Sequence, residues 1–239
     1  MLSQINNDHV KNLQRYQKVL FQRNSLLKNI KDGKSNEKEI EFWDNRLSEE
    51  AANIFFERNK IIKTIRKSSN EFAKNFNEKI DLNIKYLPKM GRNIENKFLE
   101  DEPSIDEIKV IFYESLKKTH LRDIDQRITT IGPHRDDFDI VFNDAPASIT
   151  ASRGQSRIIS LSLKLSEAKE IRNITKRKPV LILDDIFSEL DEKMREKVVT
   201  EILDFDQILL STADISLIDK KNIKDGKYFS INEGIIKAD

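Results

Sequence analysis

The sequence predicts an α/β fold in which a lobe of alternating strands and helices follows a long helical region. Residues 3 to about 100 contain few glycines and prolines and repeat their apolar residues at helical spacing. Two short apolar runs, at 180–183 and 207–210, are separated by a helical pattern. Strand, helix and strand in this order form a β-α-β unit with parallel, buried strands.

The helical region is expected to form an antiparallel arm of two or three long helices. Residues 32–36 separate the first helix from the second, and Pro88 marks the next interruption. Phe42, Trp43 and Phe55 recur at helical spacing and are expected in the core of the arm, not on its surface as platforms for stacked bases.

Capping and turn signals define the elements that follow the arm. Ser104 followed by Glu107 has the pattern of a capping box and predicts a short helix that ends near Leu116. Alternating apolar residues around a Gly132-Pro133 turn predict a β-hairpin or meander. The remaining expected elements are a helix from about Gln155 to Asn173, strands at 180–183 and 207–210, a helix from about Glu192 to Leu203 and a terminal hairpin that turns at 232–234.

The composition limits the class of protein. With 239 residues, 38% of them hydrophobic, the chain can bury a core, and no apolar run reaches the roughly eighteen residues that cross a bilayer. The N-terminus lacks the apolar segment of a secretory signal, so a cytoplasmic protein with no membrane partner is expected. Without cysteine and with three scattered histidines, any metal is expected to be Mg²⁺ on carboxylates.

Positive charge concentrates in the arm. Residues 1–100 carry 20 Lys and Arg against 14 Asp and Glu, a formal +6, whereas residues 101–239 carry 22 against 27, a formal −5. The arm is therefore the better candidate for contact with a polyanion such as DNA. The candidate DNA contacts, for which a solvated helix face is the other interpretation, are Lys60, Lys63, Arg66 and Lys67.

The most informative stretch runs from Val180 to Asp185, where four apolar residues lead directly into the adjacent carboxylates of Asp184 and Asp185. A buried strand that presents paired acids at its C-terminal end is how nucleotide hydrolases hold Mg²⁺ and polarise water. A second interpretation is that the two acids cap the next helix, since Asp is a good N-cap residue.

Upstream, residues 151–157 (Ala-Ser-Arg-Gly-Gln-Ser-Arg) form a small polar turn that opens an amphipathic helix. Such a turn presents free backbone N–H groups to an anion. Together with the acid pair, it indicates half of an ATP site. The other interpretation is a plain helix N-cap by Ser152.

The sequence contains no phosphate-binding P-loop (Walker A motif). The tripeptide Gly33-Lys34-Ser35 would require a glycine at position 28, where Lys28 stands, and it follows a helical pattern instead of a strand. The other half of an ATP site is therefore not found in these 239 residues.

Three ordered motifs resemble the RecF family of DNA replication and repair proteins, which are ABC-type ATPases related to SMC and Rad50. The motifs lie at 132–137 (Gly-Pro-His-Arg-Asp-Asp), 151–157 and 183–191 (Leu-Asp-Asp-Ile-Phe-Ser-Glu-Leu-Asp), and residues 16–24 and 42–44 also resemble the helical arm of that family. The resemblance therefore spans nearly the whole chain.

The resemblance implies a partial ABC-ATPase lobe, P-loop NTPase-like, that carries Walker B and signature motifs but lacks the N-terminal lobe with Walker A. The domains would be a helical arm at 1–120 and the C-terminal ATPase lobe at 121–239. Asp184 would hold Mg²⁺, and Asp185 would be the catalytic acid that orients the attacking water. The residues implied to bind the nucleotide are Ser152, Arg153, Gly154 and Gln155 of the signature, Asp191 of a D-loop at 188–191 that crosses a dimer interface, and a sensor hydroxyl of Thr212 or Ser211.

For function, the resemblance implies an ATP-dependent homodimeric clamp on DNA. Such a protein would bind single-stranded and gapped double-stranded DNA and act with RecR and RecO to load RecA in recombinational repair and the SOS response. Because Walker A is absent, the chain alone is expected to be inactive as an ATPase. The alternative is a non-enzymatic truncated remnant, a dimerisation or DNA-binding fragment. A C-terminal half of SMC or Rad50 type would need a longer coiled coil and a glutamate after Asp184.

Overall fold

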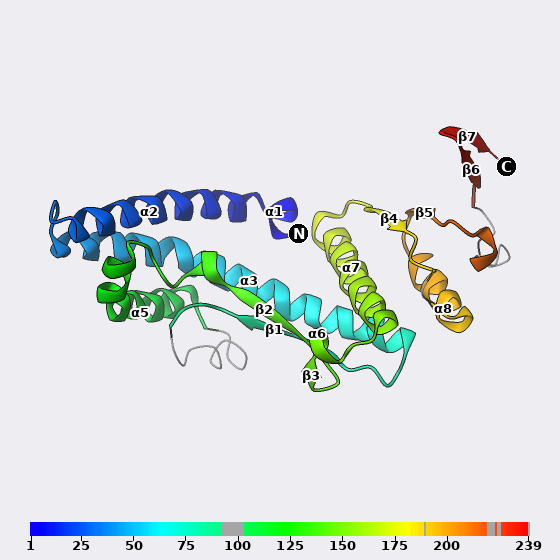
Figure 1. Cartoon of the computed structure of the whole chain (residues 1–239), viewed down its shortest axis with the longest axis horizontal. Coiled ribbons are helices and arrows are strands. Elements are labelled where there is room, and N and C mark those ends of the chain that lie inside the picture. Colours follow the sequence, from blue (N-terminus) through cyan, green and yellow to red (C-terminus); the bar gives the residue numbers. More distant parts are fainter. Residues whose placement is uncertain (92–102, 189, 219–222, 224–225, 239) are drawn as a thin grey trace. The chain divides into compact units, whose positions relative to one another are not determined.

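The chain divides into two units in a computed structural model (Figure 1). The structure describes residues 1–91, 103–188, 190–218, 223 and 226–238. The first unit consists of Met1–Asn70 and Ile80–Thr150, and the second consists of Glu71–Lys79 and Ala151–Asp239. The division into functional regions at residue 120 stays a prediction.

The first unit begins with two long antiparallel helices, drawn in blue and cyan in Figure 1. Arg15 on the first pairs with Glu50 on the second, and Arg23 pairs with Asp44, so later residues of one helix meet earlier residues of the other. The expected antiparallel pair is confirmed. The helices of this unit are α1 (Leu2–Ile5), α2 (Asn7–Lys31), the 3-10 turn η1 (Glu37–Glu39), α3 (Ile40–Phe76, whose last residues belong to the second unit), α5 (Ile105–Gln126), η2 (Pro133–Arg135) and α6 (Ala147–Thr150).

The expected capping box at the start of α5 is confirmed. The Ser104 hydroxyl accepts the backbone N–H of Glu107, and the Glu107 carboxylate accepts the backbone N–H of Ser104. The predicted end of this helix at Leu116 was wrong, because the helix continues to Gln126. Residues 117–126 contain no glycine or proline, and the helix stops only where Arg127 takes a left-handed conformation with φ 60°.

A fully buried arginine joins the three long helices of the first unit. Arg23 of α2 donates to Asp44 of α3 at 2.8 Å and to Asp123 of α5 at 2.8 Å, and all three side chains have no exposed surface. It also donates to the Thr129 hydroxyl at 2.7 Å, and His120 bonds the second oxygen of Asp44. Buried charges require such pairing, so this network fixes how the helices meet.

Aromatic residues expected in the arm core divide between core and surface. Phe55 has no exposed surface and packs edge to face on Phe112 of α5, with ring centroids 5.4 Å apart. Trp43 is partly buried against Leu26 and neighbouring apolar residues. For Phe42 the expectation was wrong: its side chain is 62% exposed, and its ring contact within the described chain is with the edge of Trp43.

A three-stranded antiparallel sheet completes the first unit. Its strands are β1 (Leu82–Leu87), β2 (Asp137–Phe142) and β3 (Ala145–Pro146), with β2 in the centre. The register pairs Leu82 with Phe142 and Leu87 with Asp137. The strand at 137–142 was expected, but its partner was not: residues 82–87 were included in the helical region, and the segment before Gly132 is not a strand.

The second unit contains the expected β-α-β order. β4 (Val180–Asp184) leads through α8 (Glu192–Ile202) to β5 (Gln207–Ser211), and the two strands are parallel. The long helix α7 (Arg153–Thr175) precedes them. The predicted parallel strand pair is confirmed, and both helices start and end within about two residues of expectation. The expected burial of both strands was wrong, because Ile182 is 74% exposed and Leu209 is 54% exposed.

The end of the chain forms the expected hairpin. η3 (Ile215–Leu217) follows β5, and β6 (Phe229–Asn232) pairs with β7 (Ile235–Ala238) through the residues Glu233 and Gly234. Both turn residues have positive φ, 50° and 79°, as a type I′ turn requires. In the described part of the chain, every helix is too short or too polar to cross a membrane.

Candidate functional site

Asp184 stands at the carboxyl end of β4, directly opposite Ser211 at the end of β5. Ligands of open parallel sheets bind outside this edge, where the strands deliver side chains to solvent. The Ser211 hydroxyl donates a hydrogen bond to the Asp184 carboxylate, and both side chains are exposed. The parallel register therefore brings together an acid and a hydroxyl that are 27 residues apart in the sequence.

Asp185 adopts an unusual backbone conformation at the point where β4 ends. Its φ is 45°, a left-handed value that few residues other than glycine and asparagine or aspartate adopt. Its N–H donates to the carbonyl of Ser211 at 3.1 Å. Its own carbonyl accepts from Nη1 of Arg157 at 3.1 Å and from the Ser188 hydroxyl at 3.2 Å. Three hydrogen bonds thus hold the Asp185 backbone in this conformation, and with it the point from which the side chain leaves the chain.

The loop from β4 to α8 is anchored at both ends. Phe187 has no exposed surface, and its carbonyl accepts the N–H of Leu190 at 3.2 Å. Asp191 is the N-cap of α8, with its carboxylate accepting the Met194 N–H at 2.8 Å. Because Asp191 fills the capping position, the interpretation of the acid pair as a helix cap is wrong. Glu189 of the predicted D-loop lies outside the described residues.

The turn before α7 presents its polar residues to solvent. Ser152 is the N-cap and forms a capping box with Gln155: its hydroxyl accepts the Gln155 N–H at 3.3 Å, and the Gln155 side chain accepts the Ser152 N–H at 2.8 Å. Ser152, Arg153 and Gln155 are exposed, and Gly154 is half-buried. The capping interpretation of Ser152 therefore describes its contacts, while its hydroxyl proton remains able to donate to an anion. Within the described chain no hydrogen bond joins this turn to Asp184, so their joint role stays a prediction.

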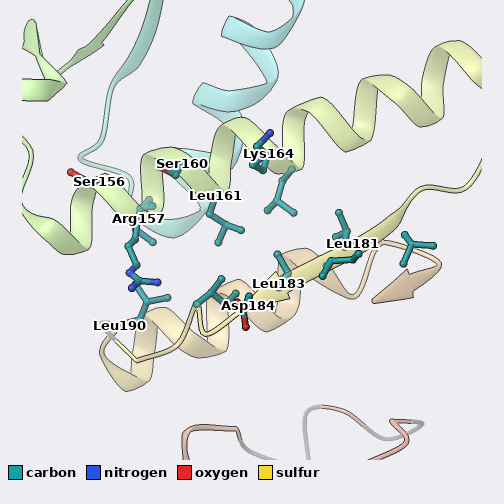
Figure 2. A pocket seen from close by; sticks show the side chains of 14 residues that line it. Ser156, Arg157, Ser160, Leu161, Lys164, Leu181, Leu183, Asp184 and Leu190 are labelled. Atoms are coloured by element: carbon teal, nitrogen blue, oxygen red, sulfur yellow. The ribbon is translucent and has the colours of Figure 1, made fainter. Parts of the chain in front are cut away.

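A groove of about 580 Å³ separates α7 from β4 (Figure 2). Leu161 and Lys164 of α7 line one side, Leu181 and Asp184 of β4 line the other, and Figure 2 shows Arg157 reaching from α7 toward the loop after β4. Of the residues predicted to bind nucleotide or metal, Asp184 alone is among those that line this groove in the described chain.

Thr212, the predicted sensor hydroxyl, is engaged in a local turn. Its hydroxyl donates to the Asp214 carbonyl at 3.1 Å and accepts the Asp214 N–H at 3.2 Å. Ser211, one residue earlier, carries the hydroxyl that contacts Asp184. The alternation of a strand indicates that Ser211 and Thr212 point in opposite directions, but which of them faces Asp184 depends on the register between β4 and β5.

The oxygen ligands at this edge suit Mg²⁺. Asp184 and Ser211 are hard donors, and Mg²⁺ in nucleotide sites usually keeps several waters and takes further ligands from phosphates. Among the described residues, no cluster of three or more His, Cys, Asp or Glu side chains could hold a metal by itself. The residues therefore fit a Mg²⁺ that binds together with a nucleotide.

The turn at 132–136 connects several elements of the first unit through buried hydrogen bonds. Nε2–H of His134 donates to the Thr129 carbonyl at 3.1 Å, so Nδ1 accepts from the Tyr16 hydroxyl at 2.6 Å. Burial lowers the pKa of His134 and raises that of Asp136. Asp136 accepts from Arg58 at 2.7 Å, from the Tyr86 hydroxyl and from the Lys89 N–H at 2.9 Å.

The candidate DNA contacts lie along one stretch of α3 in the first unit. Lys60 and Lys67 are exposed, and Lys63 and Arg66 are half-buried. In the part of the chain that the structure describes, Lys60, Arg66 and Lys67 form no ion pair, so these cations are available to a polyanion.

The fold and the site define an α/β lobe of the ABC-ATPase type with an attached helical arm. Comparisons then identify the protein more narrowly. The chain is 34% identical over 237 residues to the DNA replication and repair protein RecF of Clostridium perfringens, and 33% identical over 235 residues to RecF of Thermoanaerobacter sp. strain X514. These matches cover 99% and 98% of the chain. Over nearly its whole length the chain is therefore similar to RecF.

Solved structures of RecF are also similar to this chain. The chain matches the recombination mediator protein RecF of the RecFOR pathway in its ATP form with a TM-score of 0.80 at 30% identity, covering 99% of this chain and 60% of that one. The form with ATPrS gives a TM-score of 0.78, covering 98% and 59%. The chain spans 62% of the length of the Clostridium perfringens relative. No family model matches it.

Proposed function

We propose that this chain supplies the Walker B and signature half of a Mg²⁺-ATP site in a DNA repair protein of RecF type. The observation that carries the proposal is the pair formed by Asp184 and Ser211 at the carboxyl edge of two parallel strands. In this role Asp184 holds Mg²⁺, directly or through water, and Asp185 orients the attacking water. The relatives bound to ATP and ATPrS support nucleotide as the ligand.

The turn of Ser152, Arg153, Gly154 and Gln155 serves the second part of this proposal. Its N–H groups and the positive end of the 23-residue helix α7 favour an anion, and Gly154 permits a close backbone approach. The turn contacts the γ-phosphate of ATP held by another protomer, so the active form is an ATP-dependent homodimer. Asp191 and the sensor hydroxyl lie at the same interface.

Calorimetry of Mg²⁺-ATP binding tests the proposal. The chain is titrated alone and mixed with the part of the Clostridium perfringens relative that it does not match, as wild type, as Asp184→Asn and as Asp204→Asn, a control whose carboxylate is 77% exposed and pairs with Arg172. Binding in the mixture that only Asp184→Asn weakens, by about tenfold or more, supports the proposal. Equal binding by all variants overturns it. Absence of binding in every sample also overturns it and leaves a non-enzymatic fragment.

We propose DNA as the partner of the arm, in line with the names of the relatives. Single-stranded and gapped double-stranded DNA would lie along the basic stretch of α3, and RecR, RecO and RecA would act with the complex at gaps during recombinational repair and the SOS response. Fluorescence anisotropy with a gapped duplex tests this assignment. Replacing Lys60, Arg66 and Lys67 with Gln lowers the slope of log affinity against log salt by about 0.9 for each phosphate that the protein no longer neutralises. A slope unchanged from wild type contradicts this assignment, and Lys28→Gln, exposed on α2, is the matched control.

A further inference from the structure

We propose that Arg157 is a positioning residue that couples the start of α7 to the orientation of the Asp185 carboxylate. The inference rests on the proposed function, since it concerns the regulation of the same site. Arg157 lies near the start of α7, one helical turn after the signature residues, and its Nη1 reaches the carbonyl of Asp185 at 3.1 Å. Figure 2 shows this side chain crossing from the helix to the loop.

The coupling depends on the conformation of Asp185. A left-handed residue needs support from its surroundings, and here the support comes from three directions: Ser211 on β5, Ser188 in the loop and Arg157 on α7. The contacts to Ser211 and Ser188 come from segments close to the strand edge itself. Arg157 is the only one of these three that belongs to the helix that carries the signature turn.

The charge of Arg157 strengthens its contact with the Asp185 carbonyl. Hydrogen bonds from an ionised donor are about twice as strong as neutral ones, and Arg157 is half-buried, where water competes less for its N–H groups. An α-helix is rigid over two turns, so a shift of the first turn of α7 moves Arg157 and, through it, the Asp185 backbone. Binding of an anion at the turn of residues 152–155 thus changes the position of Asp185, the residue proposed to orient water.

This arrangement was not visible in the sequence. Arg157 closes the motif at 151–157, but its distance of 28 residues from Asp185 gives no contact signal. Its partner is a backbone carbonyl, which no residue pattern reveals.

Amide hydrogen exchange of the chain without nucleotide tests the coupling directly. In Arg157→Gln, exchange of Asp185 and the loop to Ser188 becomes about tenfold faster, while exchange in the cores of α8 and β5 stays within about twofold of wild type. Arg157→Lys keeps one charged donor and recovers part of the protection. Arg177→Gln, an exposed arginine beyond the end of α7, exchanges like wild type. Unchanged exchange in the loop of Arg157→Gln overturns the inference, and so does an equal increase throughout the second unit, which indicates a purely structural role.

Steady-state ATP hydrolysis in the same mixture, with the unmatched part of the relative, gives a second readout. Arg157→Gln lowers kcat about tenfold with KM within about twofold of wild type, because the residue acts on the water-orienting acid and not on nucleotide binding. Arg157→Lys restores part of kcat. A proportional rise in KM with unchanged kcat overturns the inference. The proposed function fails separately: it falls if Asp184→Asn hydrolyses ATP at the wild-type rate, whatever the exchange data show.

Discussion

Replacing the buried Arg23 with Met is the most demanding test of how the arm is held together. The side chain bonds Asp44 of α3, Asp123 of α5 and the Thr129 hydroxyl, and it has no exposed surface. Met is flexible and apolar and ends where the Nε of arginine stands, so the substitution keeps the inner part of the side chain and removes the charged group. Two carboxylates are then left buried without their cation.

The expected loss is about 3–5 kcal/mol, the range measured when one partner of a buried ion pair is removed. Arg23 serves two carboxylates, which places the expectation at the upper end of that range. With about 2–4 °C per kcal/mol for a protein of this size, the midpoint of thermal unfolding of the first unit falls by about 8–20 °C. Arg15→Met is the matched control, since Arg15 is 54% exposed and its pair with Glu50 contributes about 0–1 kcal/mol.

Trp43 makes the assay specific. It is the only tryptophan in the sequence and packs beside Leu26, Leu27 and Ile40 in the first unit, so its fluorescence during urea unfolding reports on that unit alone. Adding Asp44→Asn and Asp123→Asn to Arg23→Met removes the unpaired charges and is expected to recover more than half of the loss. A loss for Arg23→Met no larger than that for Arg15→Met would refute the reasoning.

Three further outcomes follow from the structure. Gly132→Ala destabilises the first unit by about 2–4 kcal/mol in urea unfolding, because φ is 127° and the new Cβ lies 2.5 Å from the Tyr16 hydroxyl oxygen. Gly33→Ala is the control, since the space around Gly33 is open, and it loses clearly less stability. Equal losses of stability in the two variants contradict the account. Burial lowers the pKa of His134 below its usual 6.5, so its contribution to stability is present above about pH 6.5 and is lost as the pH falls. The free energy of unfolding therefore changes less between about pH 5.5 and 7.5 in His134→Gln than in wild type. An equal change in both proteins argues against this account. Ile182 is 74% exposed on the two-stranded sheet, so the isolated chain is expected to self-associate and Ile182→Thr to do so less; a stable wild-type monomer in analytical ultracentrifugation counts against this.

Local signals in the sequence were sufficient for the elements whose period and caps agree. The parallel strands at 180–184 and 207–211, the capping box at Ser104 and the hairpin at 229–238 all follow from patterns within a few residues. Strand β1 was missed although Leu82, Ile84 and Tyr86 alternate as buried residues. Its six residues stand after a long helical stretch, and only pairing with β2, about fifty residues further along the chain, decides their conformation.

The contacts of the candidate site were even less predictable from the sequence. Residue types pointed to Asp184 and Asp185, but the contacts around them depend on register and on backbone geometry. Ser211 faces Asp184 because the strands are aligned residue by residue, and Thr212 turns away toward Asp214. The positive φ of Asp185 cannot be read from its identity, since aspartate also caps helices and coordinates metals.

The hydrogen bonds around Asp184 and Asp185 also bear on how the proposed site works. Ser211 orients the Asp184 carboxylate, and three hydrogen bonds hold the Asp185 backbone, so one carboxylate and the backbone of the next residue are placed before any nucleotide arrives. Placing charged groups in advance avoids reorganisation during the reaction, which is the main source of electrostatic catalysis. The bond from Arg157 makes this arrangement conditional on the position of α7. If the signature turn meets ATP on another protomer, assembly of the dimer and alignment of the water-orienting acid become one event, and hydrolysis without assembly is disfavoured.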